Sequence, residues 1–215
     1  MHQNDKFPSL YIVDHPLVLD CLTRLRDVNC DKRMFRACLH DISLLMTYEI
    51  SSDLALKDAK MNTPLVEMTG QRLSKPPVII PILRAALGMT SGVEALIPSA
   101  ATGHIGVYRD EATKQPVEYL VKLPEVEDRD IYMVDPMLAT GNSAVYAMSI
   151  LEKHGCDPKR VKFMGLIAAP EGVETFSKAY PDTKLYFAAL DSHLNEKAYI
   201  VPGLGDAGDR LFGTT

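Results

Sequence analysis

Residues 132–144 of the chain read YMVDPMLATGNSA, an apolar run that ends in one carboxylate and continues through a turn of small residues. The apolar residues predict a buried strand ending at Asp135, and the residues from Ser143 onward favour a helix. At such a junction, backbone N–H groups of the turn and the helix N-terminus attract anions. We therefore expect a phosphate monoester to bind here, with Asp135 placed to meet sugar hydroxyls. An ordinary strand–turn–helix joint is the alternative interpretation of this stretch taken alone.

Strand and helix patterns alternate on both sides of this stretch. In chain order, the expected elements are a strand at 78–83, a helix at 88–97, strands at 105–108, 118–121 and 131–134, a helix at 143–154, a strand at 161–168, a helix at 171–180 and a strand at 185–190. Such alternation predicts an α/β fold whose central sheet is mostly parallel and flanked by helices. In such sheets, ligands bind beyond the carboxyl ends of the strands, where the motifs at 83–86, 108–111 and 135–143 fall.

The chain before residue 78 is organised differently. Its first fifty residues are expected to be helical: Asp14-His15-Pro16 opens one helix, and Asp31 can cap a second. Thr63-Pro64 and Thr69-Gly70 interrupt the short mixed segments that follow, which favours a hairpin or an arm. The expected organisation is one domain, 1–215, made of N-terminal helices at 15–50, a β-arm at 54–77 and a core at 78–215.

Composition limits the classes of protein and partner. A net charge of −5 and a pI of about 5.7 argue against nucleic acid as the main partner. The most apolar run, Val78–Leu83, is too short to cross a bilayer, and residues 1–5 lead into no signal segment. We therefore expect a cytoplasmic protein without a membrane partner. The four cysteines form no C-x-x-C pair and the six histidines are scattered, so no metal cage built from side chains is expected.

Two arginines extend the expected site. Arg84 comes just after the expected strand at 78–83, and Arg109 begins a polar loop after the strand at 105–108. Guanidinium groups at two strand ends can bind a pyrophosphate through paired hydrogen bonds. Taken singly, such an arginine is more often a surface or ion-pairing residue.

A glycine-rich segment near the C-terminus is the last candidate. Its glycines stand at positions 203, 205 and 208, where they allow the backbone to approach a planar ligand closely. Asp206 between them can accept a hydrogen bond from such a ligand or hold Mg²⁺ through water. A tight surface loop is the alternative interpretation, because glycines alone do not exclude it.

Taken together, these motifs resemble those of a known family. Five strings, in this order and spacing, closely resemble uracil phosphoribosyltransferases: ILRA at 82–85, YRDE at 108–111, VDPMLATGNSA at 134–144, AAPEG at 168–172 and YIVPGLGDAGDRLFGT at 199–214. The resemblance runs from about His15 to the C-terminus. It implies a type I phosphoribosyltransferase fold and a glycosyltransferase (pentosyltransferase) activity of pyrimidine salvage. In that reaction, uracil and 5-phospho-α-D-ribose 1-diphosphate (PRPP) give UMP and diphosphate, with Mg²⁺ as cofactor.

The resemblance also implies roles for single residues. The catalytic residues would be Arg84, Arg109, Asp135 and Asp206, with the two arginines on the diphosphate. The residues implied to bind PRPP are Arg84, Arg109, Asp135, Pro136, Met137, Leu138, Ala139, Thr140, Gly141, Asn142, Ser143 and Asp206. Those implied to bind uracil are Ile200, Gly205, Asp206 and Ala207. Mg²⁺ would be held mainly through PRPP, near Asp206 through water.

Two residues depart from the family pattern. Asn142 stands where relatives usually have a second glycine, and Asn tolerates the left-handed region better than other non-glycine residues. Ala86 replaces another usual glycine and would cost about 1 kcal/mol if the position requires a positive φ. We expect these changes to affect PRPP affinity more than the reaction.

The resemblance further implies partners and leaves other functions to be weighed. We expect a homodimer or larger homo-oligomer in which residues 54–73 embrace a partner subunit, a lid at 110–116, and, as in some relatives, GTP as an effector. A non-catalytic relative that binds UMP or PRPP as a signal and controls RNA is disfavoured by the acidic pI and by the presence of every charged site residue. A phosphoribosyltransferase for another base is disfavoured by the C-terminal motif, whose backbone groups can reject cytosine.

Overall fold

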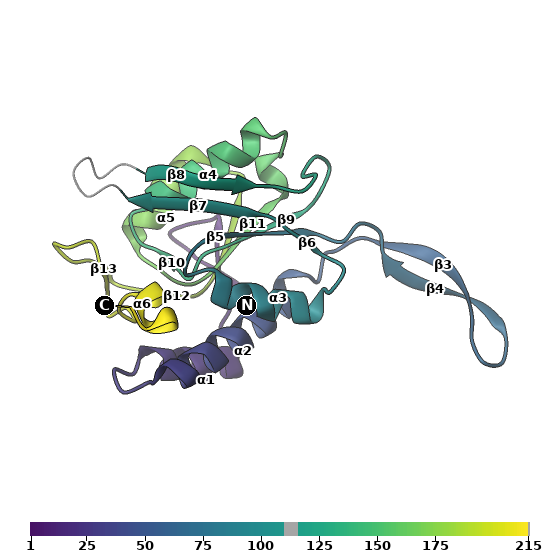
Figure 1. Ribbon diagram of the computed structural model, residues 1–215, viewed down its shortest axis with the longest axis horizontal. Coiled ribbons are helices and arrows are strands. Elements are labelled where there is room, and N and C mark those ends of the chain that lie inside the picture. The colour runs from purple at the N-terminus through teal and green to yellow at the C-terminus, as the bar shows by residue number, and fades with distance from the viewer. Residues whose placement is uncertain (110–115, 215) are drawn as a thin grey trace.

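The computed structural model describes residues 1–109 and 116–214. Within them, a sheet of ten strands carries helices on both faces (Figure 1). Its strands are β1 (His2–Gln3), β2 (Leu10–Ile12), β5 (Val78–Leu83), β6 (Ala101–Thr102), β7 (His104–Arg109), β8 (Pro116–Lys122), β9 (Ile131–Val134), β10 (Met137–Leu138), β11 (Val161–Ala168) and β12 (Lys184–Leu190). They pair in the order β1-β2-β12-β11-β9-β5-β7-β8, with β10 beside β11 and β6 beside β5. The β1–β2 and β7–β8 pairs are antiparallel and the others parallel, which confirms the expected mostly parallel sheet.

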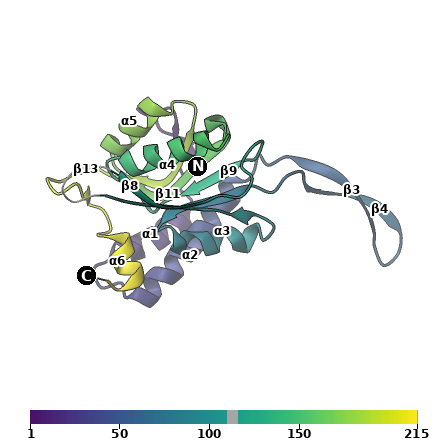
Figure 2. The same cartoon turned by 45° about the horizontal axis from the view of Figure 1, so that its top comes forward.

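Two helical layers cover the sheet (Figure 2). One face carries α1 (Pro16–Arg26), α2 (Lys32–Ile50), α3 (Leu87–Leu96) and α6 (Ala207–Phe212), and the other carries α4 (Asn142–Lys153) and α5 (Pro170–Ala179). In β5, Ile79 packs in the core of the first layer, whereas Val78 and Ile80 pack in the core of the second. Because both faces are buried, the strand is a continuous apolar run. Among the described helices, none has both the length and the apolarity needed to cross a membrane.

Most of the expected elements are present. β5, β9 and β11 have the expected bounds, and the expected helices at 88–97, 143–154 and 171–180 correspond to α3, α4 and α5. Asp31 caps α2 as expected, because its carboxylate accepts a hydrogen bond from the Met34 N–H at 2.7 Å.

The expectation that the first fifty residues are helical is wrong for the first twelve. Residues Leu10–Ile12 form β2, which lies between β1 and β12 in the sheet, with Leu10 next to Leu185 and Ile12 next to Phe187. Leu10 is fully buried there. The partner strand comes from near the other end of the chain, so the local pattern of residues 1–13 contains no sign of the pairing.

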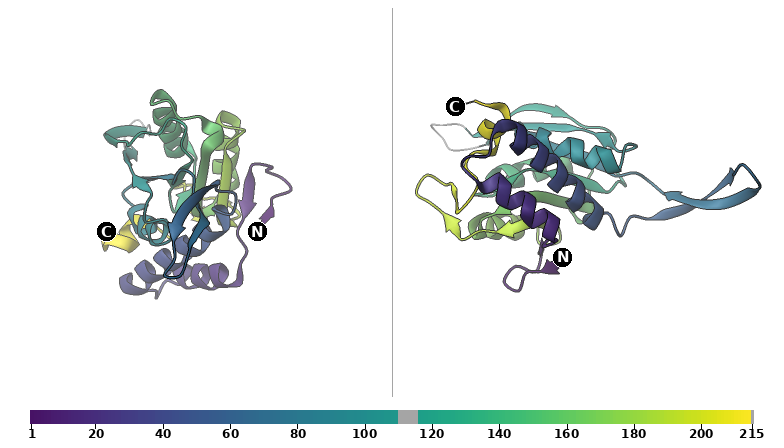
Figure 3. Two further views of the ribbon diagram at one scale, coloured as in Figure 1. Left: turned by 90° about the vertical axis from the view of Figure 1, so that its right-hand side faces the viewer. Right: turned by 90° about the horizontal axis from the view of Figure 1, so that it is seen from below.

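The expected arm is a hairpin that projects from the body of the protein (Figures 1 and 3). Strands β3 (Leu56–Asn62) and β4 (Glu67–Leu73) pair antiparallel along their whole length, from Leu56 opposite Leu73 to Asn62 opposite Glu67. They form a sheet of their own, and nearly all of their residues are exposed. Leu73 at the base of the hairpin packs against the core, and the exposed residues beyond it lie outside the core of this subunit.

Candidate active site

The carboxyl ends of three neighbouring strands bring the expected site together. β5 lies between β9 and β7 and is parallel to both, with Pro81 next to Val134 and Leu83 next to Gly106. Arg84 and Asp135, which directly follow β5 and β9, therefore lie at one edge of the sheet. Arg109 is the last residue of β7 at the same edge. Of the expected lid, residues 110–115 lie outside the described part of the chain.

The turn after β9 forms a small cup at the N-terminus of α4. A cavity of about 100 Å³ is lined by Asp135, Met137, Leu138, Ala139, Thr140, Gly141, Ser143 and Ala144. Gly141 caps α4, and its carbonyl accepts the first hydrogen bond of the helix from the Val145 N–H at 2.9 Å. The N–H groups of the first turn precede that bond and have no carbonyl within the helix to bind. An anion in the cup would therefore meet both backbone donors and the positive end of the helix dipole.

Two glycines that the sequence reasoning overlooked shape this cup. A Cβ on Gly172 of α5 would lie 2.4 Å from the carbonyl oxygen of Ala139 and 2.6 Å from that of Leu138. A Cβ on Gly165 of β11 would lie 2.5 Å from the carbonyl oxygen of Asp135. Only glycine lets these elements pack against the turn so closely. Gly172 is the last residue of the AAPEG string. The sequence therefore marked this glycine, but not the carbonyl groups of Leu138 and Ala139 against which it packs.

The two departures from the family pattern are free of backbone strain. Asn142 is the first residue of α4 and is helical, so it does not use the left-handed conformation considered for it. The residue with positive φ is its neighbour Gly141, at 84°. Ala86 has φ −63° and ψ −16°, an ordinary helical conformation, so the cost foreseen for a positive φ does not arise.

Asp135 is the most perturbed acid of the site. It is half-buried, and its Oδ1 accepts one hydrogen bond, from the Met137 N–H at 3.3 Å. The pKa of Asp135 is raised to about 7: burial is the largest cause, the hydrogen bond from the Met137 N–H lowers the pKa, and the negative charge of Asp206 adds a smaller rise. Asp206, far from Asp135 in the sequence, therefore acts electrostatically on the Asp135 carboxyl. A nearby cation would oppose this effect.

Arg84 lies beside the C-terminal helix as well as at the strand ends. Its guanidinium carbon is 5.8 Å from the centre of the Phe212 ring, within the range of a cation–π contact. A Cβ on Gly208 of α6 would lie only 3.8 Å from the Ala85 Cβ, so the turn after β5 and the start of α6 are in contact. Phe212 is therefore a further neighbour of the site that its position in the sequence did not indicate.

The residues expected to bind uracil lie on one loop that leads into α6. Ile200 is buried in β14 (Ile200–Val201), which pairs with β13 (His193–Leu194). Gly205 is exposed with φ 76°, Asp206 caps α6 by accepting from the Asp209 N–H at 2.9 Å, and Ala207 is buried. The loop leads into α6, whose start lies against the turn after β5.

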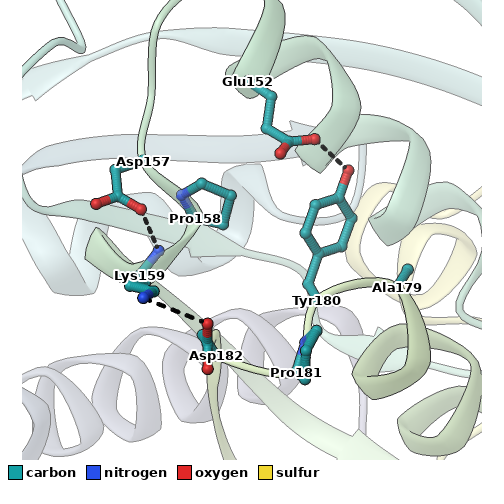
Figure 4. A pocket seen from close by; sticks show the side chains of 8 residues that line it. All are labelled: Glu152, Asp157, Pro158, Lys159, Ala179, Tyr180, Pro181 and Asp182. Atoms are coloured by element: carbon teal, nitrogen blue, oxygen red, sulfur yellow. Dashed lines mark hydrogen bonds and ion pairs between the residues drawn. The ribbon is translucent and has the colours of Figure 1, made fainter.

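A second cavity beside α4 and α5 is a different place (Figure 4). It measures about 330 Å³ and lies beside the short 3-10 helix η1 (Pro158–Arg160); none of the expected site residues lines it. Its polar side chains bind one another: the Tyr180 hydroxyl donates to Glu152 at 2.8 Å, and Lys159 pairs with Asp182 at 3.6 Å.

The described residues contain no group of three or more His, Cys, Asp or Glu side chains that could hold a metal ion. A divalent cation at the candidate site would therefore need ligands from a bound molecule besides Asp135 and Asp206.

The whole chain is similar to proteins of one family. The family model described as uracil phosphoribosyltransferase matches residues 12–214. Proteins named uracil phosphoribosyltransferase from Paraburkholderia phymatum and Burkholderia thailandensis are each 53% identical over 215 residues, covering 100% of this chain and 99% of each relative.

Solved structures share the architecture. The AQ2163 protein from Aquifex aeolicus is 31% identical, with a TM-score of 0.90 over 96% of this chain and 99% of its own. A hypoxanthine phosphoribosyltransferase from Trypanosoma cruzi with its product IMP is 15% identical, with a TM-score of 0.51 over 74% of this chain and 75% of its own. At that identity the likeness shows the fold alone, which is that of type I phosphoribosyltransferases.

Proposed function

The chain belongs to the uracil phosphoribosyltransferase family and is a pentosyltransferase of pyrimidine salvage, and from this we propose how its residues make UMP and diphosphate from uracil and PRPP. The observation that carries the assignment is the cup of about 100 Å³ at the N-terminus of α4, with Asp135 in its lining. Its backbone donors and the helix dipole support binding of the 5-phosphate group there.

The phosphate cup and Asp135 hold the ribose end of PRPP. Backbone N–H groups at the start of α4 and the hydroxyls of Thr140 and Ser143 bind the 5-phosphate, together with the neighbouring residues Pro136, Met137, Leu138, Ala139, Gly141 and Asn142. The Asp135 carboxylate accepts hydrogen bonds from the ribose hydroxyls. These contacts fix the anomeric carbon in front of the loop at 200–207, which is where a nucleophile must approach.

Arg84 and Arg109 act on the leaving group. In the reaction, the bond from the anomeric carbon to the diphosphate oxygen breaks while a bond to the uracil nitrogen forms, through a state in which the sugar carries positive charge. Negative charge builds on the departing diphosphate, and guanidinium groups stabilise such charge by several kcal/mol in a site poor in water, on the order of 3 kcal/mol per donor. The uracil nitrogen loses its proton as the new bond forms, so no strong base is required.

The residues around Asp135 and Asp206 fit the Mg²⁺ that the family implies. Two carboxylates whose charges repel, one of them with a pKa raised to about 7, form a site that a divalent cation would stabilise. Bound through the oxygens of PRPP, Mg²⁺ would supply additional positive charge for the leaving diphosphate. Removal of Mg²⁺ with EDTA is expected to abolish UMP formation, and added Mg²⁺ to restore it.

Uracil is read by the backbone near Gly205 and Ala207, with Ile200 packing behind it and Asp206 facing PRPP. Backbone donors and acceptors complementary to the pyrimidine edge would leave cytosine with one mispaired polar group, at a cost of about 1–3 kcal/mol.

Residues 110–116 are the proposed lid, which would keep water from hydrolysing PRPP.

The arm is proposed to embrace a second copy of the chain in a homodimer or larger homo-oligomer. Its exposed large apolar residues are Leu56, Met61, Leu65, Val66 and Met68, with Leu65 at 91% exposure. A two-stranded hairpin on its own is only marginally stable, and apolar surface of this kind is typical of an interface. GTP as an effector, as in some relatives, is part of the same proposal.

Two further features of the chain enter the proposal. We propose that residues 1–215 form one domain, and the pairing of β2 near the N-terminus with β12 in the C-terminal part supports this. The location is cytoplasmic, which agrees with four cysteines that are all free thiols.

The decisive experiment is UMP formation from labelled uracil, PRPP and Mg²⁺ by the purified protein. Cytosine, hypoxanthine and orotate serve as parallel substrates, and turnover is expected with uracil alone. Tight binding of PRPP or UMP without turnover would instead favour a regulatory protein, and turnover with another base would overturn the uracil assignment.

A further inference from the structure

A buried ion pair joins the end of α1 to the loop that precedes the uracil residues. Arg26 is the last residue of α1, and Asp191 follows β12 directly. The guanidinium donates two parallel hydrogen bonds, from Nη1 to Oδ2 at 2.8 Å and from Nη2 to Oδ1 at 2.6 Å. The side chain of Asp191 is 4% exposed and that of Arg26 is 23% exposed. This geometry is the strongest form of arginine–carboxylate pairing.

The pair also binds both peptide groups of one loop residue. Nη1 of Arg26 donates to the carbonyl oxygen of Gly203 at 2.7 Å, and the Gly203 N–H donates to Oδ2 of Asp191 at 2.9 Å. Gly203 has φ 66°, and a Cβ there would lie 2.1 Å from the Ile200 carbonyl oxygen. The loop is thus sharply turned at Gly203, and this turn is held by two charged groups rather than by a sheet.

A second arginine holds the other side of the same loop. Arg210 of α6 donates to the carbonyl oxygen of Leu204 at 2.8 Å and to that of Asp27 at 2.7 Å, and its guanidinium carbon lies 4.7 Å from the centre of the Phe35 ring. Leu204 precedes Gly205, and Asp27 directly follows α1. The backbone on the N-terminal side of Gly205 is therefore tied to the end of α1 through both arginines.

We infer that Arg26 and Asp191 are positioning residues for uracil: they hold the backbone of residues 203–206 at the place from which it reads the base. The inference rests on the proposed assignment of the uracil residues. Recognition by backbone groups depends on where the loop lies, and a displacement near 1 Å can cost a rate factor on the order of 100. A lysine in place of Arg26 keeps the charge but cannot make the paired bonds to Asp191 and the third to Gly203.

The test compares Arg26→Lys with wild type by steady-state kinetics in both substrates. Arg26→Lys is expected to raise KM for uracil at least tenfold and to change KM for PRPP less than twofold. The control is Arg160→Lys, which alters a different pair, with Asp128 and Asp130 at 3.3 and 3.4 Å; both KM values should stay within twofold. A change of equal size in both KM values, or none in that for uracil, would overturn the inference.

A second variant covers the case in which Arg26→Lys does not fold. Asp191→Asn keeps the shape of the side chain and one acceptor for the Gly203 N–H while removing the charge that pairs with Arg26. The same selective rise in KM for uracil is expected, and its absence in a folded Asp191→Asn protein refutes the inference. Failure of the wild type itself to make UMP would refute the proposed function instead, so the two failures are distinguishable.

Discussion

The Asp135 carboxyl makes a quantitative prediction about how stability depends on pH. Its folded-state pKa of about 7 lies above the ordinary value of 3.8, so the folded protein holds this proton more tightly than the unfolded chain does. The stability associated with the proton is fully present below pH 4 and is lost as the pH rises through 7. Replacing the group with a neutral isostere, as in Asp135→Asn, should remove this loss.

The magnitude follows from the size of the shift. A difference of about 3 pKa units corresponds to about 4 kcal/mol at pH 8. Because Asp135 is half-buried and partly screened by solvent, we expect about half of this, roughly 2 kcal/mol. For a chain of this length, that raises Tm by about 4–8 °C. Asp135→Asn should therefore unfold several degrees above wild type at pH 8 and close to it at pH 4.5.

Differential scanning calorimetry of both proteins without substrates, between pH 4.5 and 8, measures this difference. Asp182→Asn, which removes an exposed carboxylate at the far cavity, controls for the loss of one charge. Asp135→Asn should also fail to make UMP, because the neutral amide replaces the carboxylate proposed to accept hydrogen bonds from the ribose hydroxyls. Parallel Tm curves for Asp135→Asn and wild type would refute the reasoning, since the burial of the carboxylate would then carry no free-energy cost.

Five further variants test separate parts of the proposal. Arg109→Ala and Asp206→Ala should each reduce UMP formation at least tenfold with an unchanged circular dichroism spectrum, and wild-type rates in either folded variant would remove its assigned role. Deletion of residues 54–73 should give monomers in analytical ultracentrifugation, and a deletion variant that stays dimeric would rule out the arm as the embracing element. Gly172→Ala should raise KM for PRPP at least fivefold, because its Cβ would displace the cup, whereas Asn142→Gly should change it less than twofold; the opposite ranking would show that the cup is shaped differently.

The parts of the site that were predictable from sequence are those formed by neighbours along the chain. The run from Tyr132 to Ala144 specifies its own strand, turn and helix, because burial, the positive φ of Gly141 and helix initiation are local properties. The strands at 78–83 and 161–168 were found for the same reason. The expected place of the motifs at 83–86 and 135–143, beyond the carboxyl ends of the strands, followed from the general behaviour of parallel sheets.

Where the local pattern failed, the deciding contact came from a distant part of the chain. The strand at Leu10–Ile12 exists because β12 offers it an edge. The sequence alone does not show whether Asn142 and Ala86 need a positive φ. In the structure both residues have ordinary helical backbone conformations.

The sequence by itself determined the family, the reaction and the candidate polar residues of the site. Each motif consists of contiguous residues, so its side-chain types and their spacing can be read without the fold. The tertiary structure decided how those groups act on one another. Asp135 has its raised pKa because the fold buries it and brings Asp206 near, and Gly203 is held by Arg26 and Asp191 from two other elements. Burial and electrostatic coupling depend on distances in space, and distances between remote residues exist only once the chain has folded.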